Sequence, residues 1–401
     1  MSSFKNIKEQ LFFGSLVLVL ITLSLPKYSL NSQSIIVCAL CWFFYNSFQQ
    51  KYQYLKKNFI YFLLFSSLFW IALFGMLYSQ NIAEGIKNLQ KQLPFLIFPL
   101  IFFSIDITPQ IKQVLIKYFS YGVIVSAMFA ITKAGYFKIN NFGDYFYYDK
   151  FGLLLDIHTT YYAMYVIIAI AYFTEIVLKS SGSRKRIETT LILFLLIVLY
   201  ILSVRMAVIA LAVSTIILFL SKRAMLKPKN IVFLFFSILI ILFSYFSPNF
   251  QKRFNAETPE GIAISDIDTR TNQWQSVLQV IENNNLVIGA GTGDGHETLY
   301  DQYLKNGFET GYIYQYNAHN QFLETTLYYG LLGLFLLVTI MFIAFKECYL
   351  NRKYLGISII TIQIIFMITE STLESQSGVV LFAFFTAMLA SPSLSDKARI
   401  N

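Results

Sequence analysis

Apolar runs of roughly 15 to 22 residues recur along almost the whole chain and are separated by short polar clusters. Each run is close to the roughly 20 residues that a helix needs to cross a bilayer core of about 30 Å. The runs are too long for the strands of an outer-membrane barrel, and helices satisfy their own backbone groups in lipid. The pattern predicts an all-α polytopic membrane protein with about 12 transmembrane helices, centred near residues 18, 41, 68, 98, 123, 169, 196, 213, 239, 333, 362 and 384.

The longest apolar run, residues 191–220, is interrupted by Arg205. A single helix of about 30 residues would be about 45 Å long, too long for a bilayer without strong tilt. Basic clusters flank the run on both sides, and short basic loops stay on the cytoplasmic side of a membrane. The run is therefore predicted to cross twice, with Arg205 at the outward-facing tip of a tight hairpin.

One long polar interruption, residues 248–318, divides the chain into three parts. We expect a transmembrane bundle of nine helices in residues 1–247, a periplasmic loop domain in residues 248–318, and three more transmembrane helices with a short cytoplasmic tail in residues 319–401. The interruption is acidic, with a net charge of about −5 at neutral pH. Its charged residues are Glu257, Glu260, Asp266, Asp268, Glu282, Asp294, Glu297, Asp301 and Glu309, against Lys252, Arg253, Arg270 and Lys305.

Composition agrees with a membrane protein, because only 13% of the residues are charged, against about 25% in soluble domains. The net charge of +9 does not indicate nucleic-acid binding, since the basic residues lie in short clusters between apolar runs. The first run has no small-residue cleavage site behind it, so we expect an uncleaved span. The three cysteines are uninformative, and no set of His, Cys and Asp residues has metal-ligand spacing, so metal-independent chemistry is expected.

Three residues combine unusual positions with useful chemistry. Arg205 interrupts an apolar run and Arg270 is an isolated cation in the acidic interruption; guanidinium groups suit phosphate. His319 lies where the polar segment becomes an apolar helix, and imidazole is a natural proton acceptor for a hydroxyl at neutral pH. The alternatives are a snorkelling Arg205, a solvated Arg270, and a helix cap made by His319 or Asn320.

Other residues are supporting candidates. Glu324, Glu370 or Glu374 would orient His319 or bind substrate, and the sequence does not choose between them. His158, at the start of the sixth span, is a weaker candidate, and His296 is interpreted as a loop residue. The glycine cluster 289–295 lacks the spacing of a nucleotide-binding loop; turns that need positive φ explain it.

These pieces resemble the O-antigen ligase and polymerase superfamily over about residues 158–345. They are a Ser-x-Arg turn, an Arg-x-x-x-Trp opening, a Gly-x-Gly-x-Gly turn, a His-Asn-x-x-Leu-Glu segment, and a Tyr-Gly-x-x-Gly segment that follows it. In this chain they stand at Ser203–Arg205, Arg270 and Trp274, Gly291–Gly295, His319–Glu324, and Tyr329 to Gly333.

The resemblance implies a glycosyltransferase C-like architecture in the bacterial inner membrane, with an active site facing the periplasm. The donor would be a glycan on undecaprenyl pyrophosphate, and the acceptor a lipid A-core sugar or another lipid-linked glycan. It also implies that Arg205 and Arg270 hold the pyrophosphate and that His319 assists deprotonation. Beside these residues, the supporting or acceptor-binding candidates are Asn320, Glu324, Trp274, His158 and Glu370. No metal, nucleotide or other cofactor is expected. The alternatives are a repeat-unit polymerase, a protein-glycosylating transferase of the same superfamily, and a membrane solute transporter.

Overall fold

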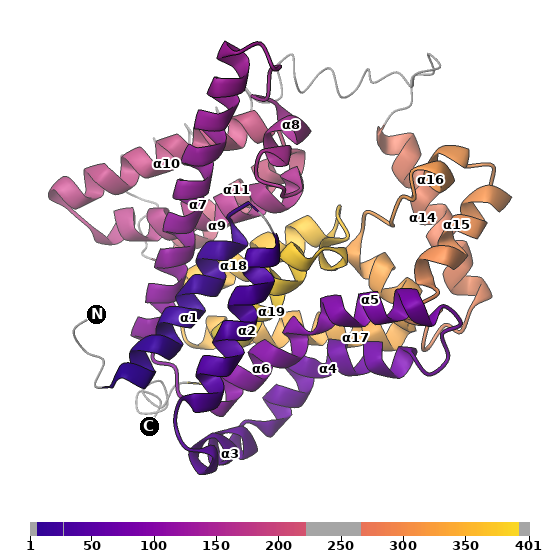
Figure 1. Cartoon of the computed structure of the whole chain (residues 1–401), viewed down its shortest axis with the longest axis horizontal. Helices are drawn as coiled ribbons and strands as arrows, with labels where there is room; N and C mark the ends of the chain where they lie inside the picture. The colour runs from indigo at the N-terminus through magenta and orange to yellow at the C-terminus, as the bar shows by residue number, and fades with distance from the viewer. Residues whose placement is uncertain (1–5, 27, 222–265, 393–401) are drawn as a thin grey trace.

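A computed structural model describes residues 6–26, 28–221 and 266–392, and it is all-helical over these ranges (Figure 1). The predicted all-α class is therefore confirmed. Every predicted span centre falls in a helix except the one near residue 239, which lies outside the described residues. The helices of the first part are α1 (Ile7–Leu23), α2 (Tyr28–Phe44), α3 (Phe48–Lys57), α4 (Phe59–Gly75), α5 (Ile82–Gln92), α6 (Pro94–Ser104) and α7 (Pro109–Ile139).

The number of membrane-crossing helices is not confirmed. Among the described residues, three helices are long and apolar enough to cross a bilayer: α7, α9 (Thr159–Lys179) and α17 (Gln321–Leu350). The pair α3 and α4 would make a fourth span, but it is bent by 87°. Shorter apolar helices of 10–17 residues include α18 (Tyr354–Met367) and α19 (Gln376–Ala390). Apolar composition thus predicted where helices form better than it predicted their lengths.

Helix α9 lies at the centre of the bundle. It packs against α7, α10 (Gly182–Leu202), α11 (Arg205–Leu220) and α18. From Thr159 to Thr174 every residue of α9 is buried, as expected for a helix that is apolar all round. The short helix α8 (Tyr148–Leu153) precedes it and packs on its first turn.

The 191–220 run breaks at the predicted place. Helix α10 ends at Leu202, Ser203 takes the left-handed conformation (φ 49°), and α11 begins at Arg205. The tight hairpin is not observed, however. Helix α10 packs mainly on α9, whereas α11 packs on α18 and α9, and the two are not packed along each other. The turn itself is what fixes the position of Arg205.

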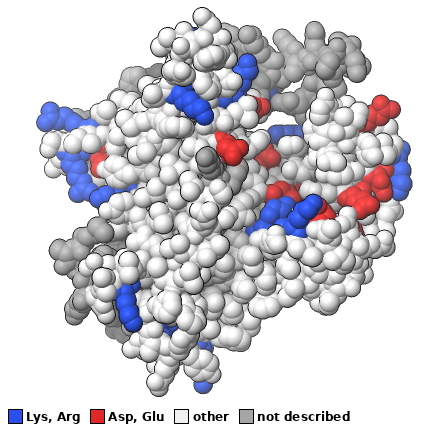
Figure 2. Space-filling model, viewed as in Figure 1, with Lys and Arg blue, Asp and Glu red and all other residues white. Residues whose placement is uncertain are grey.

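The described part of the polar interruption forms three helices, α14 (Asp266–Asn283), α15 (Gly295–Lys305) and α16 (Glu309–Ile313). They stand to one side of the bundle in Figure 1 and share a small core made by Val277, Val280, Leu299, Tyr303 and Ala318, together with Leu327 of α17. Acidic side chains gather on this side of the molecule, whereas most of the surface over the other helices is uncharged (Figure 2). The helix η2 (Thr372–Glu374) joins α18 to α19 near this unit.

Candidate functional site

A cavity of about 430 Å³ opens where the unit α14–α16 meets the bundle. It is bordered by the turn before α11, the start of α14, the segment before α17 and the segment after α18. The structure thus brings together residues that lie far apart in the sequence. Its charged and titratable lining side chains are Asp149, His158, Arg205, Arg270, His319 and Glu370.

Arg205 reaches this cavity because of the turn that precedes it. The N–H of Ser203 turns back to the carbonyl oxygens of Leu199 and Tyr200, which closes α10. Helix α11 then starts at Arg205, and its N-cap Val204 gives no side-chain cap. The first turn of a helix presents unpaired N–H groups and a partial positive charge. Val204, Arg205 and Met206 all line the cavity. The guanidinium of Arg205 and the N-terminal end of α11 therefore both face it.

Arg270 lies in the first part of α14, and Gln273 follows one turn later; both line the cavity. Gln273 is 1% exposed, and its Oε1 has no hydrogen-bond partner among the described residues. Trp274 does not line the cavity. Its indole N–H instead donates to the carbonyl oxygen of Ala318 at 2.9 Å, which holds the residue beside His319. The expected supporting role of Trp274 is therefore indirect in this geometry.

His319 does not cap the helix that follows it. Asn320 is the N-cap of α17, and its Oδ1 accepts the N–H groups of Phe322 at 2.9 Å and Leu323 at 3.1 Å. His319 itself adopts φ 43°, a left-handed conformation that costs a non-glycine residue roughly 1–2 kcal/mol. Strain of this kind persists where the surrounding structure fixes it, often at functional sites. The imidazole is left to line the cavity.

Glu370 is the carboxylate that contacts His319. Its Oε1 lies 3.2 Å from His319 Nδ1. Burial by itself raises the pKa of Glu370. The hydrogen bond and charge of His319, followed by the charges of His158 and Arg270, outweigh that effect and lower the pKa below its usual value. Glu370 is therefore a carboxylate at neutral pH, suited to accept the Nδ1–H of the imidazole.

Residues 190–338 of this chain match the family model described as O-antigen ligase. This part of the chain is similar to that family. The match includes Arg205, Arg270 and His319, whereas Glu370 and His158 lie outside it. No curated protein matches the sequence. The similarity supports a glycosyl-transferring membrane enzyme of the O-antigen ligase type.

His158 and Asp149 also line the cavity. His158 is the N-cap residue of α9 without making a side-chain cap, and its ring lies edge-on to Tyr161. The Asp149 carboxylate accepts the Thr159 hydroxyl at 3.0 Å. Neither Asp149 nor Gln273 was a sequence candidate. The only sequence signal for Gln273 was its position one helical turn after Arg270, whereas Asp149 had none.

The glycine cluster of the O-antigen ligase region is structural. Gly289 and Gly291 have φ of 72° and 102°, which confirms turns that need positive φ. Helix α17 is broken at Gly330, where φ is 62°. The cluster is hydrogen-bonded to the helix just before that break, because the N–H groups of Ala290 and Gly291 donate to the carbonyl oxygens of Leu327 and Tyr328. The backbone amides of the cluster thus satisfy carbonyl oxygens next to the break in the helix.

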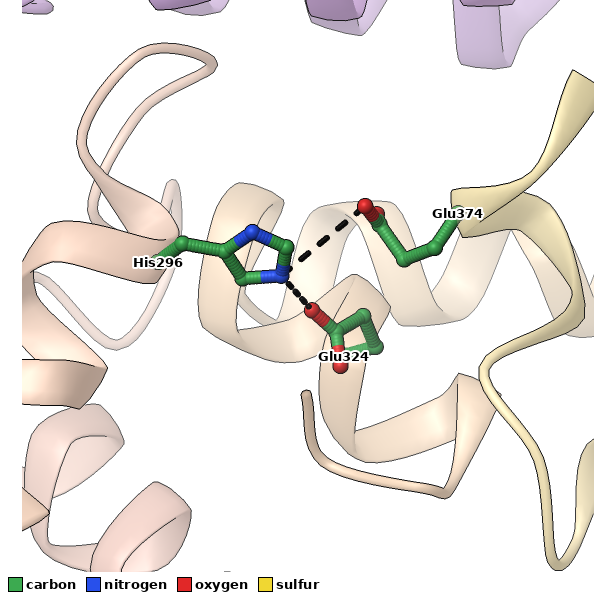
Figure 3. Close-up of side chains that lie close together, drawn as sticks. All are labelled: His296, Glu324 and Glu374. Carbon is green, nitrogen blue, oxygen red and sulfur yellow. Dashed lines mark hydrogen bonds and ion pairs between the residues drawn. The ribbon is translucent and has the colours of Figure 1, made fainter. Parts of the chain in front are cut away.

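A second titratable cluster lies outside the cavity lining. His296 is in the first turn of α15, so its interpretation as a loop residue is wrong. Its Nε2 is 2.8 Å from Glu324 Oε1 and 3.8 Å from Glu374 Oε2 (Figure 3). Glu324 therefore contacts His296 rather than His319. The Lys91 ammonium lies 3.2 Å from Glu374 Oε2.

This second cluster has the composition of a metal site. His296, Glu324 and Glu374 each offer one ligand atom, and these atoms lie within 4.8 Å of one another. Lys91 already brings a positive charge to Glu374, and an additional cation would be repelled by it. The arrangement is better described as a closed network of ion pairs that links α5, α15, α17 and η2.

Proposed function

We propose that this protein transfers a glycan from undecaprenyl pyrophosphate to a sugar hydroxyl at the periplasmic face of the bacterial inner membrane. The observation that carries the proposal is the composition of one cavity. Two arginines and a histidine paired with a carboxylate all line it, on a chain with an O-antigen ligase region. A lipid-linked pyrophosphate needs cations to hold it, and a hydroxyl acceptor needs a base.

Arg205 and Arg270 would bind the pyrophosphate of the donor. Guanidinium offers forked donors that match phosphate oxygens, and the positive end of the α11 helix dipole adds to their attraction for the phosphate charge. Pyrophosphate is already a good leaving group. Cations that stabilise the charge developing on it as the glycosidic bond breaks therefore lower the barrier directly.

His319 would accept the proton of the acceptor hydroxyl. Since the carboxylate of Glu370 accepts from Nδ1, Nε2 is the nitrogen available to the substrate, and the charge of Glu370 stabilises the imidazolium that forms. The acceptor oxygen bonds to the anomeric carbon of the donor while the bond from that carbon to phosphate breaks. The proton passes to His319 Nε2, and polyprenyl pyrophosphate leaves with the electron pair.

A lipid A-core sugar is the proposed acceptor, which makes the protein an O-antigen ligase. A strain that lacks the gene should then display core without attached polymer. A strain that displays core carrying a single repeat unit would instead identify a repeat-unit polymerase. In either case purified protein should move labelled sugar from lipid-linked glycan extracted from the deletion strain.

The residue roles are tested in the same transfer reaction. His319→Ala and Arg205→Ala should each reduce kcat/KM by at least about 100-fold, since each removes a group that acts in the transition state. Lys305→Ala is the matched control, because Lys305 is an exposed cation of the same unit and lies outside the cavity lining. Transfer that survives both His319→Ala and Arg205→Ala would reject the proposed mechanism.

A further inference from the structure

Glu324 lies behind the cavity and does not line it. Its side chain is 1% exposed and accepts hydrogen bonds from three donors. Oε1 accepts from His296 Nε2 at 2.8 Å. Oε2 accepts from the Ala318 N–H at 2.7 Å and from the Ser371 hydroxyl at 2.9 Å. Three donors around the two buried oxygens of Glu324 favour its ionised form. If the carboxyl were protonated, its own O–H hydrogen would point at one of these donors.

Two of these three donors are chain neighbours of the cavity pair. Ala318 precedes His319, and Ser371 follows Glu370. One carboxylate oxygen thus joins the segment that carries the imidazole to the segment that carries its partner. The contact between the two segments is the one between His319 and Glu370, which are 51 residues apart in the sequence. The position of Glu324 Oε2 therefore sets the separation of the two peptides beside the pair.

Each neighbour is also held from its other side. The Trp274 indole donates to the carbonyl oxygen of Ala318 at 2.9 Å. The Tyr161 hydroxyl donates to the carbonyl oxygen of Ser371 at 3.2 Å. Both peptides are consequently fixed between a ring donor and the shared Glu324 carboxylate. This is the kind of supporting shell that holds catalytic side chains within a fraction of an ångström.

We propose that Glu324 is a positioning residue that sets the geometry between His319 and Glu370, with His296 as the cation that orients its carboxylate. The inference rests on the proposed glycan transfer by that pair. Misplacing reacting groups by about 1 Å costs on the order of 100-fold in rate. Glu324 never touches substrate in this arrangement, so its removal acts on the chemical step and not on donor binding.

The direct test is Glu324→Gln, which keeps the shape of the side chain but turns one oxygen into an NH₂ group facing a donor. We expect kcat to fall by about 10- to 100-fold, while KM for the lipid-linked donor changes by less than about twofold. Glu347→Gln is the matched control on the same helix, since Glu347 also accepts a hydrogen bond, from Tyr61 at 2.7 Å. That variant should keep the wild-type kcat.

A double-mutant cycle separates positioning from a general loss of folding. Because Glu324 acts through Glu370 and His319, Glu324→Gln should lower kcat by less than about twofold when Glu370→Gln is already present. The inference would be overturned if Glu324→Gln lowered kcat by the same factor with and without Glu370→Gln. It would also be overturned if the Glu324→Gln variant had a kcat within twofold of wild type. If Glu324→Gln does not fold, Ser371→Ala takes its place, with an expected fall of about three- to tenfold in kcat and wild-type kcat as the contradicting result.

Failure of this inference and failure of the proposed function give different results. If His319→Ala abolishes transfer while Glu324→Gln leaves kcat unchanged, the glycan-transfer mechanism stands and only the positioning role is wrong. If His319→Ala leaves transfer intact, the pair is not catalytic and both are wrong. Competition by inorganic pyrophosphate gives a separate readout of the arginine site, and Glu324→Gln should leave its inhibition constant within about twofold of wild type.

Discussion

His319 Nδ1 lies 3.2 Å from Glu370 Oε1, and this contact joins the segment before α17 to the segment after α18. In the proposed mechanism, this contact orients the imidazole of His319 as a base. The imidazole does not cap α17, because Asn320 is the N-cap residue of that helix. The carboxylate is 7% exposed and is charged despite its burial, so the two side chains act as one unit.

Replacing Glu370 tests that unit. Glu370→Gln preserves size but removes the negative charge that stabilises the imidazolium, so kcat should fall by about 10- to 100-fold. The lowered pKa of Glu370 also predicts the pH range of the effect. Because the pKa of Glu370 in the folded protein lies below the ordinary value of 4.5, the side chain stays ionised there down to at least that pH. The factor by which the wild-type rate exceeds the Glu370→Gln rate should therefore become smaller only below about pH 4.5.

The measurement is the initial transfer rate between pH 4 and pH 9 with lipid-linked glycan as donor. Glu282→Gln, which changes an exposed carboxyl on α14, is the control and should follow the wild-type profile. Equal rates for wild type and Glu370→Gln at neutral pH would contradict the role of the pair.

The turn before Arg205 gives a stability prediction. Ser203 has φ 49°, a conformation that a β-branched residue adopts at a cost of roughly 1–2 kcal/mol. Ser203→Val should lower the midpoint of thermal unfolding and also reduce transfer, because the turn positions Arg205. Ser203→Gly is the matched control, since glycine takes this conformation without strain. Unfolding midpoints followed by size-exclusion chromatography in detergent check both, and a Ser203→Val midpoint equal to wild type would refute the argument.

The sequence predicted some of this structure for physical reasons that can be traced to particular residues. Apolar runs predicted helix positions, and basic clusters on both sides of residues 191–220 predicted the break at Ser203. The candidates Arg205, Arg270, His158, His319 and Glu370 do meet in one cavity. The number of spans stays a prediction, since apolar composition does not reveal where a helix bends or stops short.

Contacts between distant segments were the other limit. Glu324, Glu370 and Glu374 are equivalent candidates in the sequence, and only the three-dimensional arrangement assigns Glu370 to His319 and Glu324 to His296. His296 was missed because a lone histidine after a glycine turn has no periodic neighbours that indicate a helix. Its partner is 28 residues away, beyond any local pattern.

Gly293 is predicted to be irreplaceable for packing. A Cβ at this position would lie 2.1 Å from the carbonyl oxygen of Asn81, a backbone atom that has no room to move. Gly293→Ala should therefore destabilise the protein by about 1–3 kcal/mol and loosen the attachment of the glycine cluster to the bundle. Gly14→Ala is the control, since nothing lies within 4 Å of its Cβ. Thermal unfolding of both variants in detergent checks this, and equal midpoints would show that the Asn81 backbone yields.

His296 predicts how stability depends on pH. Burial lowers its pKa, but the hydrogen bond to Glu324 and the charges of Glu374 and Glu324 raise it to about 9, against the opposing charge of Lys91. The rings of Tyr300 and Tyr328 are its other neighbours. A raised pKa contributes stability that is fully present below the ordinary value of 6.5 and is lost as pH rises through about 9.

The unfolding midpoint of the wild type should therefore fall between about pH 6.5 and pH 9, as the imidazolium loses its proton and leaves Glu324 without its charged partner. His296→Gln has no charge to lose, so its midpoint should be lower than that of wild type at pH 6 and should change less across the same range. His158→Gln, which removes a histidine without altering the Glu324 network, should keep the wild-type pH dependence. If wild type and His296→Gln lose stability in parallel as the pH rises, the protonated His296 is not what ties α15 to α17.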